Sequence, residues 1–125
     1  MQCVAQTPTF ESSAKDCGMS DDEKHKVVTF VAENPDAGDL IKGTGGARKI
    51  RFPFKSKGKS GGVRVVTYYC GEDIPVFLLD VFKKGDKINL SQAERNELKA
   101  LLGDMADDYR AANRAKLAQL QERVG

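Results

Sequence analysis

Hydrophobic residues recur at helical spacing in two segments near the start of the chain. The first segment follows Pro8, and its apolar positions are Phe10, Ala14 and Cys17. The second opens with a capping box, in which Ser20 and Glu23 can each satisfy a free backbone donor of the first turn, and its apolar stripe is Val27, Phe30 and Val31. The pattern therefore predicts two helices, the second ending at Asn34-Pro35.

β-Branched and aromatic residues dominate three short runs that follow a glycine-rich loop at residues 36–47. The runs span residues 48–54, 62–70 and 75–82 and predict three strands. A long Lys/Gly/Ser connection joins the first two, and the tight turn Gly71-Glu72-Asp73 joins the last two, which favours an antiparallel meander. Residues 2–6 are a candidate for an additional N-terminal strand.

A second capping box, Ser91 to Glu94, opens a C-terminal helix with one apolar face formed by Leu98, Leu101, Leu102 and Met105. Inside a helix Gly103 costs about 1 kcal/mol relative to alanine, and Asp104 could cap a fresh start, so residues 104–125 could form a separate helix. That segment has a loose apolar stripe, formed by Tyr109, Ala112, Leu117, Leu120 and Val124. The sequence leaves open whether this stripe packs on the core, docks on a partner or frays.

The order of these elements predicts an α+β fold, in which a small antiparallel sheet is flanked by two N-terminal helices and one or more C-terminal helices. A chain of 125 residues is expected to form a single domain. Residues 1–103 would form the body of this domain, and residues 104–125 a helical extension of it or a tail.

Strand alternation predicts which side chains share a face of the sheet. The first strand separates Lys49 and Arg51 from Ile50, Phe52 and Phe54. The second separates Arg64, Val66 and Tyr68 from Val63, Val65, Thr67 and Tyr69. The third separates Val76, Leu78, Asp80 and Phe82 from Phe77, Leu79 and Val81. If the apolar faces lie against the helices, the open face collects Lys49, Arg51, Arg64, Tyr68 and Phe82.

Composition narrows the class of protein. Hydrophobic residues make up 40% of the chain, and no apolar run approaches the roughly 20 residues that span a bilayer. The N-terminus lacks the basic start and apolar middle of a secretory signal, so we expect a cytoplasmic protein that does not contact membranes. The three cysteines, with no CxxC pair and a single histidine, predict neither disulfides nor a metal site, and we expect buried free thiols.

Positive charge is concentrated in the middle of the chain. The net charge is only +2, but residues 42–64 contain eight basic residues and no acidic one. The rest of the chain contains eighteen acidic and twelve basic residues. A segment with this much positive charge attracts polyanions such as nucleic acid. Cations beside exposed aromatic rings suit single-stranded RNA in particular, because its phosphates need charge and its bases need a flat surface. A solvated hairpin that protects an edge strand is the alternative.

Two nucleotide-binding motifs fail on inspection. Residues 53–60 end like a Walker A loop, but Pro53 replaces the first glycine and a strand follows where a helix is required. Residues 43–46 lack the spacing and the following helix of a dinucleotide fingerprint. No cofactor is therefore expected.

Three segments of the chain resemble the RelE/HigB group of bacterial type II toxin–antitoxin toxins. In order, they are ENPDAGDLIKGTGGARKIRF, KSKGKSGGVRVVTYY and FLLDVFKKGDKINLSQAERNELKALL. The resemblance covers roughly residues 20–102 and implies a small antiparallel sheet flanked by helices. It also implies an mRNA-cleaving endoribonuclease that acts on translated message in the ribosome. A cognate antitoxin, expected to be a helix-turn-helix DNA-binding protein, would hold it inactive. ParE-like toxins of the same superfamily, which bind DNA gyrase, and a non-catalytic RNA-binding module are the alternatives.

The resemblance also suggests site residues. The basic first strand of the family matches Lys49 and Arg51, its central catalytic arginine matches Arg64, and its last basic residue best matches Lys84. Some members add a tyrosine or histidine at the C-terminal end of the site, where this chain has Phe82, Ile88 and Leu90. His25 lies far upstream on a predicted helix surface, so the chemistry would depend on cations and Tyr68. We expect RNA contacts from Arg48, Lys55, Lys57, Lys59, Phe82 and Lys83.

The reaction that the resemblance implies needs no metal: the 2′-hydroxyl attacks the adjacent phosphodiester and leaves a 2′,3′-cyclic phosphate and a 5′-hydroxyl. Arg64 would neutralise charge on the phosphoryl oxygens. Lys49 is the candidate for proton transfer, because two neighbouring arginines disfavour its charged form. Arg51 and Lys84 would hold the RNA backbone or stabilise the leaving oxygen.

Overall fold

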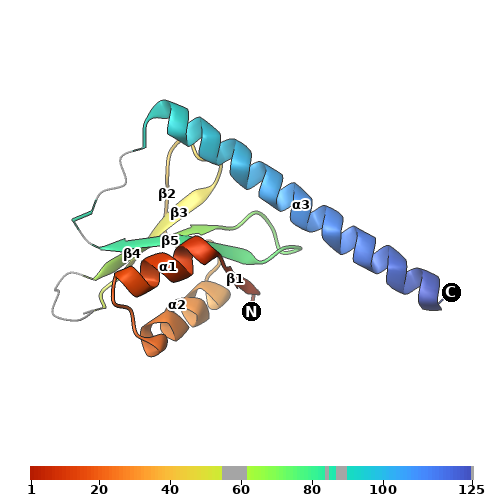
Figure 1. The fold of residues 1–125 in the computed structure, drawn as a ribbon, viewed down its shortest axis with the longest axis horizontal. Coiled ribbons are helices and arrows are strands. Elements are labelled where there is room, and N and C mark those ends of the chain that lie inside the picture. Colours follow the sequence, from red (N-terminus) through yellow and green to blue (C-terminus); the bar gives the residue numbers. More distant parts are fainter. Residues whose placement is uncertain (55–61, 84, 87–89, 125) are drawn as a thin grey trace.

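The computed structural model describes residues 1–54, 62–83, 85–86 and 90–124, which form one sheet with helices on both of its faces (Figure 1). This confirms the predicted α+β class. The elements in chain order are β1 (Val4–Gln6), α1 (Pro8–Asp16), α2 (Asp21–Glu33), β2 (Asp39–Leu40), β3 (Ala47–Phe52), β4 (Val63–Tyr68), β5 (Val76–Lys83) and α3 (Gln92–Val124).

The strand order in the sheet is β1-β5-β4-β3-β2. β3, β4 and β5 form the predicted antiparallel meander. The candidate N-terminal strand is present as β1, and it pairs with β5 in parallel, so the complete sheet is mixed. β1 is followed directly by α1. The backbone N–H of Thr7, at the junction between the two, donates to the Leu78 carbonyl of β5 at 3.2 Å. The two-residue strand β2 lies within the predicted loop and pairs with β3.

α1 and α2 cover one face of the sheet and start where the sequence predicted. The Thr7 hydroxyl caps α1 by accepting from the Phe10 N–H at 3.2 Å, and Ser20 and Glu23 form the expected capping box of α2. These helices enclose the larger core with the inward side chains of the strands. Its fully buried members include Phe10, Ala14, Val27, Val31, Val63, Val65, Val76 and Leu78.

A bulge interrupts the alternation of β5. The β4–β5 register shifts between Val66 and Thr67, so that Val66 opposes Asp80 whereas Thr67 opposes Leu78. As a result Val81 faces the same core as Val76 and Leu78, and Phe77 and Leu79 face the other side together with Phe82. The prediction from uninterrupted alternation is therefore wrong for the end of β5, because a bulge adds one residue to the strand.

α3 crosses the opposite face of the sheet and then continues beyond it (Figure 1). Leu102 and Ala106 are buried there against Ala47, Val66, Tyr68, Ile74 and Phe77. The prediction of a new helix at Asp104 is wrong, because α3 passes through Gly103 without a break. Leu102 and Ala106, which precede and follow this glycine in the sequence, both pack on the sheet. Their burial outweighs the low helix propensity of glycine. The division of the chain at residue 103 remains a prediction.

Candidate functional site

One row of side chains crosses the three central strands at the end of the sheet away from the C-terminal half of α3. Arg51 lies directly opposite Arg64 in the β3–β4 pair, and Arg64 lies directly opposite Phe82 in the β4–β5 pair. Directly opposite side chains share one face of a sheet. Arg51 is exposed, and Arg64 and Phe82 are half-buried. We call these three residues the arginine row, because they place two guanidinium groups beside an aromatic ring.

A second row lies about 7 Å further along the strands, the distance that two residues of a strand span. Lys49 opposes Val66, and Val66 opposes Asp80. Lys49 is exposed and shares its face with Arg51, as alternation predicted. Asp80 adds a half-buried carboxylate to this face, and its Oδ1 accepts from the Val81 N–H at 2.8 Å. Sequence reasoning placed Asp80 on the face of Phe82 but did not select it, although it is the only acidic residue within β3, β4 or β5.

The charges of these rows are not neutralised by ion pairs within the described part of the chain. The two ion pairs found there are Lys24–Asp21 and Arg110–Asp73. The Arg64 guanidinium makes only a long contact of 3.5 Å with the carbonyl of Val63. Three cations on one face without a carboxylate bound to them form a surface suited to a phosphate chain.

A glycine-rich loop, residues 43–46, fixes the start of β3 against the first turns of α3. Gly45 has a φ of +76°, and a Cβ atom there would lie 2.9 Å from Cγ of Lys99. The buried Thr44 closes the loop, since its hydroxyl donates to the Ile41 carbonyl at 2.7 Å and accepts from the Ala47 N–H at 3.2 Å. The motif therefore aligns the strand that carries the cations and is not a nucleotide loop.

Gly62 has a corresponding role where the chain enters β4. Its φ is +75°, and a Cβ atom would lie 2.1 Å from the carbonyl oxygen of Phe52. Only glycine allows the two backbones to approach so closely. The entry of β4 is therefore held against the end of β3, two residues before Arg64.

Tyr68 is not on an open surface. It is 4% exposed and lies beneath α3 in the cluster that contains Leu102 and Ala106. Burial, and secondarily the neighbouring Cys70 thiol, raise the pKa of the Tyr68 hydroxyl to about 12. Alternation placed this side chain on the correct face, but the path of α3 over that face was not predictable from β-strand periodicity.

Arg48 and Lys83 lie on the other face of the sheet. Arg48 opposes Thr67, and its guanidinium donates to the Gly38 carbonyl at 3.1 Å. Lys83 opposes the fully buried Val63 and is close enough to Cys17 to affect the pKa of that thiol, which burial nevertheless raises. The structure therefore does not bring these two cations to the arginine row. Of the other predicted site residues, Lys55, Lys57, Lys59 and Lys84 lie outside the described residues.

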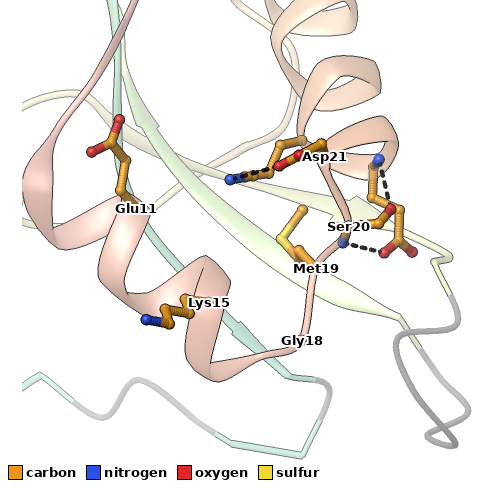
Figure 2. A pocket seen from close by; sticks show the side chains of 8 residues that line it. Glu11, Lys15, Gly18, Met19, Ser20 and Asp21 are labelled. Atoms are coloured by element: carbon orange, nitrogen blue, oxygen red, sulfur yellow. Dashed lines mark hydrogen bonds and ion pairs between the residues drawn. The ribbon is translucent and has the colours of Figure 1, made fainter.

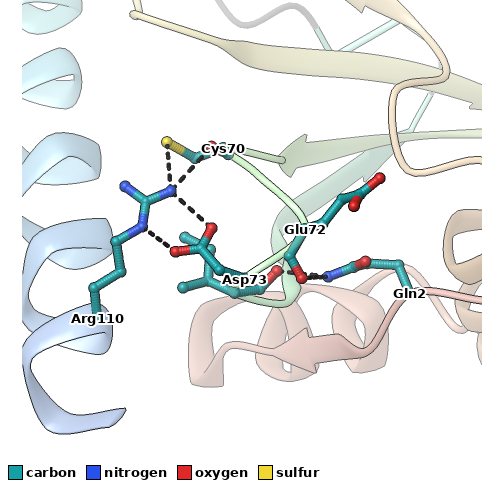
Figure 3. A network of polar contacts seen from close by, with 6 residues as sticks. Gln2, Cys70, Glu72, Asp73 and Arg110 are labelled. Carbon is teal, nitrogen blue, oxygen red and sulfur yellow. Dashed lines mark hydrogen bonds and ion pairs between the residues drawn. The ribbon is translucent and has the colours of Figure 1, made fainter. Parts of the chain in front are cut away.

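α3 is tied to the body of the protein by Arg110 (Figure 3). Its Nε donates to Oδ2 of Asp73 at 2.6 Å, and its Nη2 donates to Oδ1 at 3.1 Å and to the Cys70 carbonyl at 3.1 Å. These bonds lower the pKa of the Asp73 carboxyl below its usual value. They anchor the middle of α3 to the turn between β4 and β5.

A hollow of about 750 Å³ lies between the end of α1 and the start of α2 (Figure 2). Four of its polar residues are engaged with one another: the Ser20 backbone N–H donates to the Glu23 carboxylate at 2.9 Å, and Lys24 pairs with Asp21 at 3.3 Å. This hollow is on the opposite side of the sheet from the arginine row, and we assign no site to it.

The cysteines and the histidine differ in how well they were predicted. All three cysteines are free, but Cys3 and Cys70 are exposed and only Cys17 is partly buried, so the prediction of buried thiols is wrong for two of them. Both exposed cysteines lie at strand ends, which the spacing of cysteines alone does not reveal. His25 is exposed on α2, as predicted.

The fold is that of a small α+β protein with three cations, Lys49, Arg51 and Arg64, on one face of its sheet. A family model described as the RelE toxin of the RelE / RelB toxin-antitoxin system matches residues 2–124. The chain therefore belongs to the RelE toxin family, which confirms the resemblance seen in the sequence. The family implies a cognate antitoxin as partner. In the described part of the chain, no helix is both long and apolar enough to cross a membrane.

Proposed function

We propose that this toxin is a metal-independent endoribonuclease that cleaves translated mRNA in the ribosome. The observation that carries the proposal is the direct opposition of Arg51 and Arg64 on an accessible sheet face, with Phe82 next in the same row. Guanidinium groups bind phosphate oxygens, and an adjacent ring gives an unstacked base a flat surface. Cleavage of translated message would take place in the cytoplasm.

The reaction divides among the cations of the face. The 2′-oxygen forms a bond to phosphorus while the bond from phosphorus to the 5′-oxygen breaks, leaving a 2′,3′-cyclic phosphate and a 5′-hydroxyl. Arg64 sits at the centre of the row and is assigned to the phosphoryl oxygens, where negative charge increases in the transition state. Arg51 binds the same phosphate or its neighbour from the adjacent strand.

We assign the proton transfer to Lys49. The 2′-hydroxyl must lose a proton and the 5′-oxygen must gain one. Tyr68 is unsuited to either task, because its hydroxyl is buried under α3 away from the cations, and burial raises its pKa to about 12, which also disfavours it as a base. Lys84 stays assigned to the leaving oxygen by family resemblance alone, and Lys55, Lys57 and Lys59 to contacts with ribosomal RNA.

The test compares three substrates with purified wild-type protein, Arg64→Ala and Arg48→Ala. The substrates are naked mRNA, mRNA on programmed ribosomes, and supercoiled DNA with gyrase. We expect cleavage on ribosomes with a cyclic phosphate product, a loss of about 100-fold or more in Arg64→Ala, and normal cleavage by Arg48→Ala. Inhibition of gyrase without RNA cleavage would replace the proposal by a ParE-like function, and salt-dependent RNA binding without cleavage would replace it by a binding module.

A further inference from the structure

A groove with acidic groups runs beside the first half of α3. Its volume is about 880 Å³, its floor includes Val66 and Leu79, and its α3 wall includes Leu98, Leu101 and Met105. Three carboxylates also line it, those of Asp80, Asp104 and Asp108, and no lysine or arginine is among its described lining residues. A complementary occupant would therefore be a helix with an apolar stripe and basic residues beside it.

The chain itself carries such a helix. Eighteen residues make five turns of an α-helix, so Leu120 lies on the same face of α3 as Leu102, and Val124 on the same face as Ala106. Leu102 and Ala106 are each 2% exposed, whereas Leu120 is 56% and Val124 is 88% exposed. The face that packs on the sheet thus continues into the second half of α3, where Leu120 and Val124 are not covered by any described residue. Basic residues outnumber acidic ones three to one within residues 111–124.

We propose that two copies of this chain associate with their α3 helices antiparallel, so that the second half of each α3 occupies the acidic groove of the other. The arrangement has twofold symmetry, and each copy contributes both surfaces. A helical segment of this length is marginal in water without packing, so contact of Leu120 with a second copy would stabilise it.

The sequence of α3 is self-complementary about Ala112. Asp108 lies four residues before Ala112 and Lys116 four residues after it. In an antiparallel pair centred on Ala112, Asp108 of each copy therefore lies opposite Lys116 of the other, and symmetry forms this pair twice. Small side chains at the centre, Ala112 and Ala115, allow the helix axes to approach closely.

The apolar residues follow the same register. Leu120 lies eight residues beyond Ala112, and Asp104 lies eight residues before it. Leu120 of one copy thus meets the turn of the other that bears Leu101 and Met105, both of which line the groove.

The experiment measures the mass of the purified full-length chain by sedimentation equilibrium over a range of concentrations. We expect a reversible monomer–dimer equilibrium. Asp108→Lys and Lys116→Asp each turn two attractive pairs into repulsive ones and should raise the dissociation constant about tenfold. The double variant Asp108→Lys with Lys116→Asp should restore the wild-type value. Arg114→Asp is the matched control, because it makes the same charge change about 200° around the helix from Ala112 and should leave the equilibrium unchanged.

Three results would overturn the proposal: a monomer at every concentration, single reversals that leave the dimer intact, or a double variant that fails to re-form it. Circular dichroism of each variant establishes that α3 remains helical, so that a lost dimer is not a lost helix. If the chain alone is monomeric but Asp108→Lys weakens its complex with the antitoxin, the groove belongs to the antitoxin and not to a second copy.

Discussion

Arg51 and Arg64 lie directly opposite each other on β3 and β4, and no ion pair involves either of them in the described part of the chain. Like charges in directly opposite positions destabilise a sheet. A pair of this kind is advantageous where an anion comes between the two groups, which is the role we assign to a phosphate of the RNA backbone. Stability and activity should therefore respond in opposite directions to removal of one charge.

Arg51→Gln should make the protein more stable and less active. Loss of the cross-strand repulsion is expected to raise the free energy of unfolding by about 0.5 kcal/mol, and loss of a phosphate contact should slow cleavage at least tenfold. Urea denaturation and the ribosome cleavage assay measure the two effects. Arg48→Gln serves as control, because Arg48 lies on the opposite face and binds the Gly38 carbonyl; it should slow cleavage little. A parallel loss of stability and activity in Arg51→Gln would contradict this reading.

Tyr68→Phe should leave the rate of cleavage within about threefold of wild type, since the hydroxyl lies in the core with a raised pKa of about 12. The pH dependence of the rate should also be unchanged. Single-turnover cleavage measured across the pH range, beside Lys49→Met, compares the two candidates for proton transfer directly. A large loss of rate in Lys49→Met together with a near wild-type rate in Tyr68→Phe is the expected pattern. A rate loss above 100-fold in Tyr68→Phe would place the hydroxyl in the reaction.

The glycines of the chain should differ sharply in their tolerance of alanine. Gly103 is exposed within α3, and a Cβ atom there would meet nothing beyond its own helix backbone within 4 Å, so Gly103→Ala should raise the free energy of unfolding by about 0.5–1 kcal/mol. Gly45→Ala should lower it by more than about 1 kcal/mol, because φ is +76° and Lys99 is in the way. Thermal melting of both variants decides this, and equal effects of the two would refute the structural account of the loop.

The bond between Asp73 and Arg110 should make stability depend on pH in the acidic range. The pKa of Asp73 is lowered in the folded state, so its ionised form stabilises the fold. This contribution is fully present above the unfolded pKa of about 4 and is lost as the pH falls through the folded value. Asp73→Asn should therefore lower the melting temperature at pH 7 and have a smaller effect near pH 2. Glu72→Gln, at the exposed neighbouring position, is the control and should show no such trend.

Local patterns predicted the helices, the central meander and the face that carries Lys49, Arg51 and Arg64. Capping boxes and strand alternation are properties of adjacent residues, and the sequence contains them in full. The parallel pairing of β1 and the short strand β2 depend on contacts between distant segments. The same is true of the bulge in β5, which reversed the expected orientation of Val81.

The position of α3 was the largest gap in the prediction of the site. Alternation put Tyr68 beside the arginines, but only the tertiary structure reveals that Leu102 and Ala106 cover it. Gly103 suggested a helix end, yet packing on the sheet carries the helix past it. The place of Asp80 on this face was predictable, since it is the one carboxylate within β3, β4 and β5 and alternation puts it on the face of Phe82.

The most direct test of the central claim is to map the 5′ ends of cellular mRNA after a brief pulse of expression of the wild type, Arg64→Ala or Arg48→Ala. The account predicts new 5′-hydroxyl ends inside coding frames for the wild type and for Arg48→Ala, and none for Arg64→Ala. Growth arrest without new ends, or new ends that persist in Arg64→Ala, would contradict it.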